Sequence, residues 1–341
     1  MTHPLPTEAE LAEVADVTAR IRASISTVLS GLDHAVTATL AVVLAEGHLL
    51  MEDVPGVGKT TLARAFAKSV AGSVGRIQFT PDLLPSDVTG VSIYRSDEHR
   101  FEFRPGPIFA NVVIADEINR ASPKTQAALL ESMQEHAVTV DGQTRPLPRP
   151  FLVVATQNPV EMEGTYPLPE AQRDRFMAQV SVGYPAPRDE MEMLDSHDGV
   201  DPLDGVQPVT DAATLARIIS VSRRIYAAPA IKQYIVDLVT ATREETGLRL
   251  GASPRAALQL LAASKSRAAM AGRNHVLPDD VKALVVAVLA HRLIPSTEAR
   301  LSGRTSQQIA QEILGRTPVP TSARDLPIKR EPAVPVRAAV Q

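Results

Sequence analysis

The chain has 341 residues, of which 44% are hydrophobic and 22% are charged, and its formal net charge at pH 7 is −4. This length suits two domains with buried cores, and the small negative charge gives no general attraction to nucleic acid or to anionic membranes. The sequence contains no cysteine, which excludes disulfides, cysteine-ligated zinc and thiol catalysis and agrees with a reducing compartment.

The N-terminus and the apolar segments indicate a cytoplasmic protein without membrane insertion. Residues 1–13 carry acids and prolines instead of the basic start and apolar run of a signal peptide. The most apolar segments, residues 35–45 and 281–290, are far shorter than the roughly 20 residues that a membrane-spanning helix needs.

The first part of the chain is predicted to be helical. Apolar residues recur at helical spacing over residues 8–29, where Thr7 is a suitable N-cap, and a second helix is expected over residues 32–45. The Ser30-Gly31 pair separates the two helices.

Residues 48–63 read as a short apolar strand, a Gly/Pro turn and a helix. This order is typical of a phosphate-binding P-loop, in which backbone N–H groups and a helix N-terminus surround the negative charge. In the pattern G-x-x-x-x-G-K-[ST], Lys59 reaches the β- and γ-phosphates and the Thr60 hydroxyl helps to hold Mg²⁺. Asp53 replaces the first glycine, so a chance glycine-rich turn is the alternative at this point. The predicted nucleotide-binding residues are Asp53, Val54, Pro55, Gly56, Val57, Gly58, Lys59, Thr60 and Thr61.

Three further strands are predicted after the helix over residues 59–70. They cover residues 76–80, 91–94 and 100–104, and the last two are expected to pair as a hairpin. The loop over residues 81–90 is rich in leucine and proline, and it is either a packed connection or a working surface.

The apolar run of residues 108–117 predicts a strand that is buried on both faces of a parallel sheet. It ends in Asp116 and Glu117, and the carboxyl ends of such strands are where open α/β sheets bind ligands. Asp116 is suited to the Mg²⁺ shell and Glu117 to polarising an attacking water. Two solvated acids at a strand end are the alternative.

A helix over residues 122–134 and a hairpin over residues 137–147 lead to a second buried strand, residues 151–158. This strand ends in Asn158, which can orient the attacking water, contact the γ-phosphate or simply cap a turn. A short helix over residues 168–176 follows and carries Arg173 and Arg175. These arginines are candidates for a finger that acts on the γ-phosphate of a neighbouring subunit, or for a surface salt bridge. A last strand is expected over residues 178–182.

A proline-rich linker leads into a small helical bundle. Its helices are predicted over residues 212–227, 229–245, 254–271 and 278–293. Arg255 lies in the first turn of the third helix, where it could contact a bound phosphate or remain solvated. The segment from residue 316 to residue 341 is predicted to be disordered.

The order of these elements is that of an AAA+ ATPase. The expected fold is α/β: an AAA+ P-loop module with a parallel sheet sandwiched by helices, followed by a small all-α lid domain. We divide the chain into an N-terminal helix (1–28), a nucleotide-binding core (29–184), a linker (185–210), a helical lid (211–315) and a tail (316–341).

Within this class the chain resembles the MoxR family, whose members carry a helix-2 insert and act like chaperones. The resemblance covers roughly residues 29–293. It rests on four motifs, EDVPGVGKT at 52–60, ADEINRASPKTQAALLE at 115–131, ATQNP at 155–159 and LPEAQRDRF at 168–176. Asp53 is similar to the usual loop of this family. Arg173 stands where an apolar residue is more usual, so we assign the finger to Arg175 and keep Arg173 as the second candidate.

The resemblance implies ATP and Mg²⁺ as cofactors and a role for each site residue. Thr60 and Asp116 would hold Mg²⁺ and Glu117 would activate the water. Asn158 would position that water, and Arg255 would sense the γ-phosphate in cis.

The resemblance also implies partners. Arg175 would come from the next subunit, so the active form is expected to be a ring, with a hexamer as the expected size. The loop over residues 81–90 and the hairpin over residues 137–147 would face a central pore or a client. The implied clients are partner proteins, among them proteins with von Willebrand factor type A domains that bear metal sites.

Three other functions stay open at the level of the sequence. An ATP-switched regulatory scaffold with little hydrolysis is disfavoured by the intact Glu117, Asn158 and Arg175. A nucleic-acid motor has weak support, because the net charge is −4 and the positive residues around the inserts are only Arg95, Arg100, Arg104 and Arg145. A magnesium-chelatase-like motor subunit is a nearer relative that only the detail of the motifs disfavours.

Overall fold

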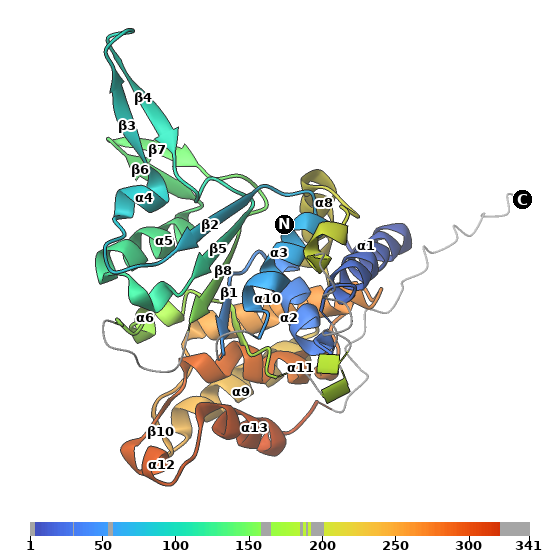
Figure 1. Cartoon of the computed structure of the whole chain (residues 1–341). Helices are drawn as coiled ribbons and strands as arrows, with labels where there is room; N and C mark the ends of the chain where they lie inside the picture. Colours follow the sequence, from blue (N-terminus) through green and yellow to red (C-terminus); the bar gives the residue numbers. More distant parts are fainter. Residues whose placement is uncertain are drawn as a thin grey trace, which may run out of the picture.

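The fold is described from a computed structural model, for residues 4–29, 31–53, 57–157, 165–184, 187–188, 190–191 and 201–320. Its centre is a five-stranded parallel sheet with the strand order β2-β5-β8-β1-β9 (Figure 1). The strands are β1 (Leu49–Glu52), β2 (Val74–Gln78), β5 (Val112–Asp116), β8 (Leu152–Gln157) and β9 (Ala178–Val180). Four of them lie within segments predicted to be strands, and β2 begins and ends two residues before the predicted segment 76–80.

Helices cover both faces of the sheet, because successive side chains of each strand point to opposite sides. Leu49 and Met51 belong to the core shared with the N-terminal helices, and Leu50 belongs to the core on the other face. The first face carries α1 (Glu8–Ser26), α2 (Asp33–Leu44) and α3 (Lys59–Ser69), and the second carries α4 (Pro85–Thr89) and α5 (Pro123–Glu135). The predicted parallel sheet between helices is confirmed.

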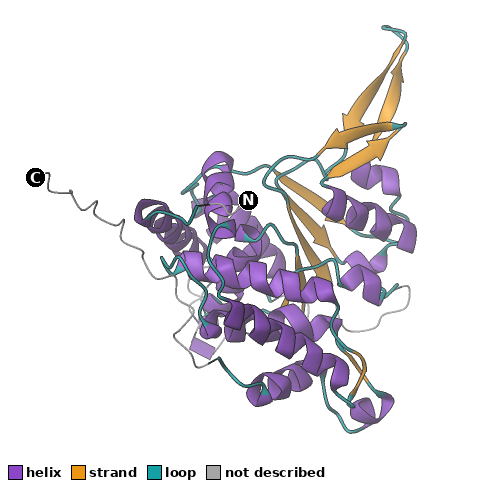
Figure 2. Cartoon of the chain, turned by 180° about the vertical axis from the view of Figure 1, so that it is seen from behind, coloured by secondary structure: helices purple, strands orange, loops and turns teal. Residues whose placement is uncertain are grey.

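Two antiparallel hairpins extend from one end of the core. They are β3 (Gly90–Arg95) with β4 (Arg100–Pro105), and β6 (Ala137–Val140) with β7 (Gln143–Pro146). Figure 2 shows both in orange, and the longer one stands well beyond the helices. The Arg145 guanidinium lies 4.0 Å from the centre of the Phe103 ring and joins the two hairpins by a cation–π contact. The loop predicted before β3 contains the short helix α4.

The C-terminal part is helical and packs on the first face of the core. Its helices are α8 (Ala212–Arg223), α9 (Pro229–Glu244), α10 (Pro254–Met270), α11 (Pro278–Leu289), α12 (Thr297–Leu301) and α13 (Ser306–Arg316). The 3₁₀ turn η1 (Ile118–Arg120) follows β5 in the core, and η2 (Pro202–Gly205) precedes α8. Within the lid, η3 (Ala290–Arg292) follows α11, and β10 (Leu248–Leu250) pairs with β11 (Ile294–Pro295) as a two-stranded ribbon. Helices α12 and α13 and the ribbon were not predicted, and α11 ends at Leu289, before the predicted end at residue 293.

The helical lid and the core share one apolar interior. Helix α10 packs against α1, α2 and α8, and α11 packs against β9. The lid therefore lies beside the N-terminal helices and the amino end of the sheet (Figure 1). Within the described ranges, no helix is both long and apolar enough to cross a bilayer.

Candidate functional site

The predicted phosphate-binding loop joins the carboxyl end of β1 to the start of α3. Gly58 is the N-cap of α3 and has φ +89°, a left-handed conformation that glycine adopts without steric cost. Among the described residues no side chain caps α3, so the N–H groups of its first turn are available to a ligand. Thr61 follows in this turn. Val54, Pro55 and Gly56 lie outside the described residues.

Lys59 lies between the ends of two neighbouring strands. Its Nζ donates to the backbone oxygen of Asp53 at 2.5 Å and lies 3.5 Å from the backbone oxygen of Gln157. Burial lowers the pKa of Lys59, and the nearby Asp53, Glu117 and Asp116 carboxylates oppose this shift. A phosphate in the loop would meet an ammonium group that carbonyl oxygens already hold in place.

Thr60 and Asp116, the two residues predicted to hold magnesium, lie within hydrogen-bond distance of each other. The Thr60 hydroxyl donates to Asp116 Oδ1 at 2.9 Å, and the Thr156 hydroxyl lies 3.4 Å from the same oxygen. Arg76 Nε donates to Asp116 Oδ2 at 2.9 Å, so a positive charge already faces the buried carboxylate. Hydroxyl and carboxylate oxygens beside a phosphate loop are the donors that Mg²⁺ takes together with substrate phosphates. The residues present therefore fit a nucleotide with its magnesium ion.

Glu117 follows Asp116 in a strained backbone conformation. Its φ is +56°, which costs a non-glycine residue about 1 kcal/mol or more. Its N–H donates to Thr156 Oγ1 at 2.9 Å and thereby fixes this conformation. The carboxylate Oε2 accepts hydrogen bonds from Gln78 Nε2 at 3.1 Å and from Arg120 at 2.7 Å. Glu117 is thus restrained by the side chains of Gln78 and Arg120, neither of which was predicted to belong to the site.

Asp53 has a structural role that explains why it can replace the glycine of the P-loop pattern. Its Oδ2 accepts hydrogen bonds from Ser181 Oγ at 2.8 Å and from the Gly183 N–H at 2.6 Å. Both partners follow β9, which is the neighbour of β1 in the sheet. The side chain of Asp53 therefore ties the start of the loop to the adjacent edge strand.

The two candidate finger arginines face different surroundings. Arg173 ends α6 (Glu170–Arg173), and its charge acts on Glu52 at the carboxyl end of β1, whose pKa is raised by burial. Arg175 instead lines a cavity of about 140 Å³ together with Arg255, which we call the arginine cavity. Its other lining residues are Glu46, Gly47, His48, Met133, Gln134, Met177 and Gln259.

The arginine cavity lies at the amino end of β1, because Gly47 and His48 directly precede that strand. Lys59 follows the carboxyl end, and the four residues of β1 separate the two ends by about 13 Å. Arg255 therefore lies away from the P-loop of its own chain. This placement gives no support to the role in cis predicted for Arg255, which stays a prediction.

The charges around the arginine cavity leave it positive. Glu46 is paired with Arg223, and burial lowers the pKa of His48 to about 4, so His48 is neutral near pH 7. Among the described residues, the side chains of Arg175 and Arg255 have no hydrogen-bond or ion-pair partner. Two unpaired guanidinium groups in one cavity are suited to an anion such as a phosphate.

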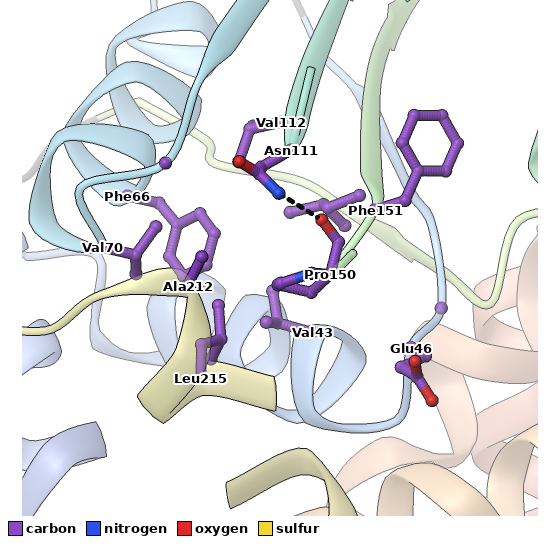
Figure 3. A pocket seen from close by; sticks show the side chains of 13 residues that line it. Val43, Glu46, Phe66, Val70, Asn111, Val112, Pro150, Phe151, Ala212 and Leu215 are labelled. Atoms are coloured by element: carbon purple, nitrogen blue, oxygen red, sulfur yellow. Dashed lines mark hydrogen bonds between the residues drawn. The ribbon is translucent and has the colours of Figure 1, made fainter. Parts of the chain in front are cut away.

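A second, small cavity does not belong to the site. It lies among α2, α3, α8 and the amino edge of the sheet, and Phe66, Val70 and Leu215 are among its apolar lining side chains (Figure 3). Asn111 donates to the Pro150 oxygen at 3.0 Å at its rim. It has room for about 10 Å³, no more than one water molecule.

The structure brings together most of the predicted residues but not all. Lys59, Thr60, Asp116 and Glu117 meet at the carboxyl ends of β1 and β5, as expected. Asn158 lies outside the described residues, so its role stays a prediction. Gln78 was missed because only the pairing of β2 with β5, which sets it opposite Asp116, shows its proximity to Glu117.

Comparison with known families identifies both parts of the chain. Residues 48–178 match the model of the ATPase family associated with various cellular activities (AAA). Residues 240–313 match the model of the AAA lid domain. These ranges agree with the sheet that carries the P-loop and with the helical lid.

Relatives match over most of their lengths. The chain is 48% identical to the uncharacterised protein YeaC of Bacillus subtilis, over 87% of this chain and 92% of YeaC. It is 43% identical to chaperone MoxR1 of Mycobacterium tuberculosis, over 86% of this chain and 80% of MoxR1. A solved structure of a Cytophaga hutchinsonii protein assigned as an ATPase superposes with a TM-score of 0.84 at 37% identity, and covers 92% of this chain and 98% of its own.

Proposed function

Because the chain belongs to the MoxR family of AAA+ ATPases, we propose that it hydrolyses ATP in a ring of its own copies and uses the energy to remodel partner proteins. One observation supports the assembly into a ring. Each chain has its P-loop at one end of β1 and, in a cavity at the other end, two arginines that have no partner in the part of the chain that the structure describes. The P-loop and the arginines of one chain cannot reach the same nucleotide, whereas the arginines of a neighbouring copy can reach the nucleotide in that P-loop.

The P-loop side of the site would bind the nucleotide and its metal. The N-terminus of α3 and Lys59 would hold the phosphates, and Thr60 and Asp116 would hold Mg²⁺, which neutralises charge on the phosphate oxygens. Glu117 would act as general base on the attacking water after it leaves Gln78 and Arg120. Asn158 would position that water.

The arginine side of the site would come from the next subunit. Arg175 would act as the finger on the γ-phosphate, and Arg255 would contact the same phosphate in trans. An arginine finger contributes about 10³- to 10⁵-fold to the rate of comparable hydrolases, so an isolated chain should be nearly inactive. We expect a hexamer.

The hairpin of β3 and β4 is the surface best suited to a client. Phe101 and Tyr94 near its tip are 73% and 51% exposed, and their ring centres are 5.3 Å apart. Exposed aromatic side chains of this kind favour contacts with other proteins. Proteins with von Willebrand factor type A domains remain the client class that the family resemblance implies.

The proposal of a nucleic-acid motor gains no support from the hairpins. Arg95 lies 3.2 Å from Glu102, Arg100 pairs with Glu98, and Arg145 packs on Phe103. Most of the positive groups on the inserts are therefore already engaged within the chain.

Steady-state phosphate release by the full chain tests hydrolysis. Glu117→Gln removes the base but keeps the shape of the side chain, so it should bind ATP and release phosphate far more slowly than the wild type. Equal, slow release by both would leave an ATP-switched scaffold as the function.

Mixed rings test the contribution of the second subunit. Glu117→Gln subunits keep their arginines, and Arg175→Ala subunits keep their P-loop and Glu117. Each should be nearly inactive alone, and mixing them should restore phosphate release. No gain on mixing, in a preparation that forms mixed rings, would show that Arg175 does not act in trans. A pull-down with Glu117→Gln and ATP should then retain the client.

A further inference from the structure

We propose that Arg292 and Asp174 are positioning residues that hold Arg175 and Arg255 together as one unit. This inference rests on the function proposed above. Asp174, Ser253 and Arg292, which we call the Asp174 clamp, lie directly behind the arginine cavity. They join the core segment that carries Arg175 to the lid helix that carries Arg255.

Arg292 is buried at the boundary between the lid and the core. Its side chain is only 2% exposed, and its Nε donates to Asp174 Oδ1 at 2.8 Å. Its other donors bind the backbone oxygens of Asp174, Phe176, Met177 and Val288. His291 adds a contact of 3.2 Å to the backbone oxygen of Phe176. The lid therefore holds the backbone on both sides of Arg175.

Asp174 extends the connection to the start of α10. The Ser253 hydroxyl lies 3.1 Å and 3.2 Å from the two carboxylate oxygens of Asp174. Ser253 is the N-cap of α10, yet its side chain does not cap the helix. It donates across the boundary instead, and the carboxylate lies near the positive end of α10, where a negative charge is favourable. Arg255 is two residues further along this helix.

Arg292 also reaches into the wall of the arginine cavity. It donates to Gln259 Oε1, and Gln259 lines the cavity one helical turn after Arg255. Residues four apart lie on the same face of a helix, so fixing Gln259 also fixes the face that presents Arg255. Burial lowers the pKa of Arg292 to about 10, and the nearby Arg255 adds to this effect, so Arg292 remains charged near pH 7.

Stability alone is a weak reason for such a buried charge. Replacing a buried ion pair by apolar residues is often neutral or stabilising, because desolvation offsets much of the attraction. The buried donors of Arg292 bind Asp174, Gln259 and the backbone around Arg175. They therefore hold these groups in defined positions relative to one another. A displacement of about 1 Å at a catalytic group can cost about 100-fold in rate, so this precision matters for a finger.

The test uses mixed rings in which one subunit only donates its arginines. Donor subunits carry Glu117→Gln, and acceptor subunits carry Arg175→Ala, so restored phosphate release reports donated arginines only. The donor Glu117→Gln/Arg292→Met should restore at least about tenfold less activity than Glu117→Gln. The milder donor Glu117→Gln/Ser253→Ala, which loses only the link to α10, should restore about two- to fivefold less.

Glu245→Gln in the same donor background is the matched control. Glu245 is also a buried lid carboxylate, 8% exposed and 2.6 Å from Arg316, but it lies outside the clamp. This donor should restore as much activity as Glu117→Gln alone. Binding of a fluorescent ATP analogue and the size of the ring should be unchanged in all donors, because the P-loop lies at the other end of β1.

The outcomes separate the two proposals. If Glu117→Gln itself restores nothing, the proposed action in trans fails. If it restores activity and the Arg292→Met and Ser253→Ala donors restore just as much, the clamp does not position the arginines. If Arg292→Met fails to fold, the Ser253→Ala donor decides alone. Loss of activity in the Glu245→Gln donor as well would assign the effect to lid stability and overturn the inference.

Discussion

His48 is expected to make the protein sensitive to acid. The side chain is 5% exposed at the amino end of β1. Its Nδ1 accepts a hydrogen bond from the Val153 N–H at 3.1 Å, and its Nε2 lies 3.0 Å from the backbone oxygen of Met133. Both contacts are satisfied only by the neutral ring with its proton on Nε2. Burial accordingly lowers the pKa of His48 from 6.5 to about 4.

The sign and size of the effect follow from proton linkage. Below the unfolded pKa of 6.5 the unfolded chain binds a proton that the folded chain excludes, so the free energy of unfolding falls as the pH falls. The relation gives a loss of about 2 kcal/mol between about pH 7.5 and about pH 5. The loss approaches about 3 kcal/mol near the folded pKa of about 4.

The variant His48→Gln isolates this contribution, because glutamine can also donate to Met133 and accept from Val153. Urea unfolding of the wild type and the variant at about pH 7.5 and about pH 5 should show that the variant loses about 2 kcal/mol less. His136 and His291, whose pKa values are also lowered by burial, act in both proteins and cancel in the difference. Replacing the exposed His34 by glutamine is the control. Between the two pH values this variant should lose as much free energy of unfolding as the wild type. An equal loss in His48→Gln and the wild type would refute the reasoning.

Three further predictions concern the loop, the base and the sheet. Asp53→Gly restores the glycine of the P-loop pattern but removes the ties to Ser181 and Gly183, so the Kd of a fluorescent ATP analogue should rise by about three- to tenfold. Gln78→Ala releases one restraint on Glu117 and should raise basal phosphate release severalfold without changing that Kd; an unchanged rate would argue against the restraint. Gly75→Ala would place a Cβ 1.8 Å from the Pro107 oxygen and should lower the stability by about 2–4 kcal/mol in thermal melts. Gly205→Ala, which meets no atom within 4 Å, should change the melting temperature little.

Much of the fold could be predicted because its signals are local. The strand that ends in Asp116 is a continuous apolar run, and α10 begins with Ser253-Pro254, so periodicity and turn residues place both. Helix α13 was missed although its signal is present, since Thr305 and Gln308 form a capping box at its start. The five-residue helix α12 and the two-residue strand β11 are too short to show a period.

The candidate site was predictable only where a motif fixes the chemistry. Lys59, Thr60 and Asp116 belong to patterns whose spacing reflects the phosphate geometry. The place of Arg255 depends on how the lid packs on α1 and α2, which no local pattern encodes. The contact between Arg292 and Asp174 joins positions 118 residues apart, so only the tertiary structure reveals it.

The separation of the P-loop and the arginine cavity at the two ends of β1 gives each chain a direction. A contact that joins one end to the opposite end of the next copy is head-to-tail. Such contacts form a closed ring only if the rotations between successive copies add up to a full turn. A chain with a defective P-loop would then silence its own site, and a chain without its arginines would silence the neighbouring site on one side. A chain with both defects would silence two sites, so the activity of a mixture would depend on how the defects are distributed among chains as well as on their number.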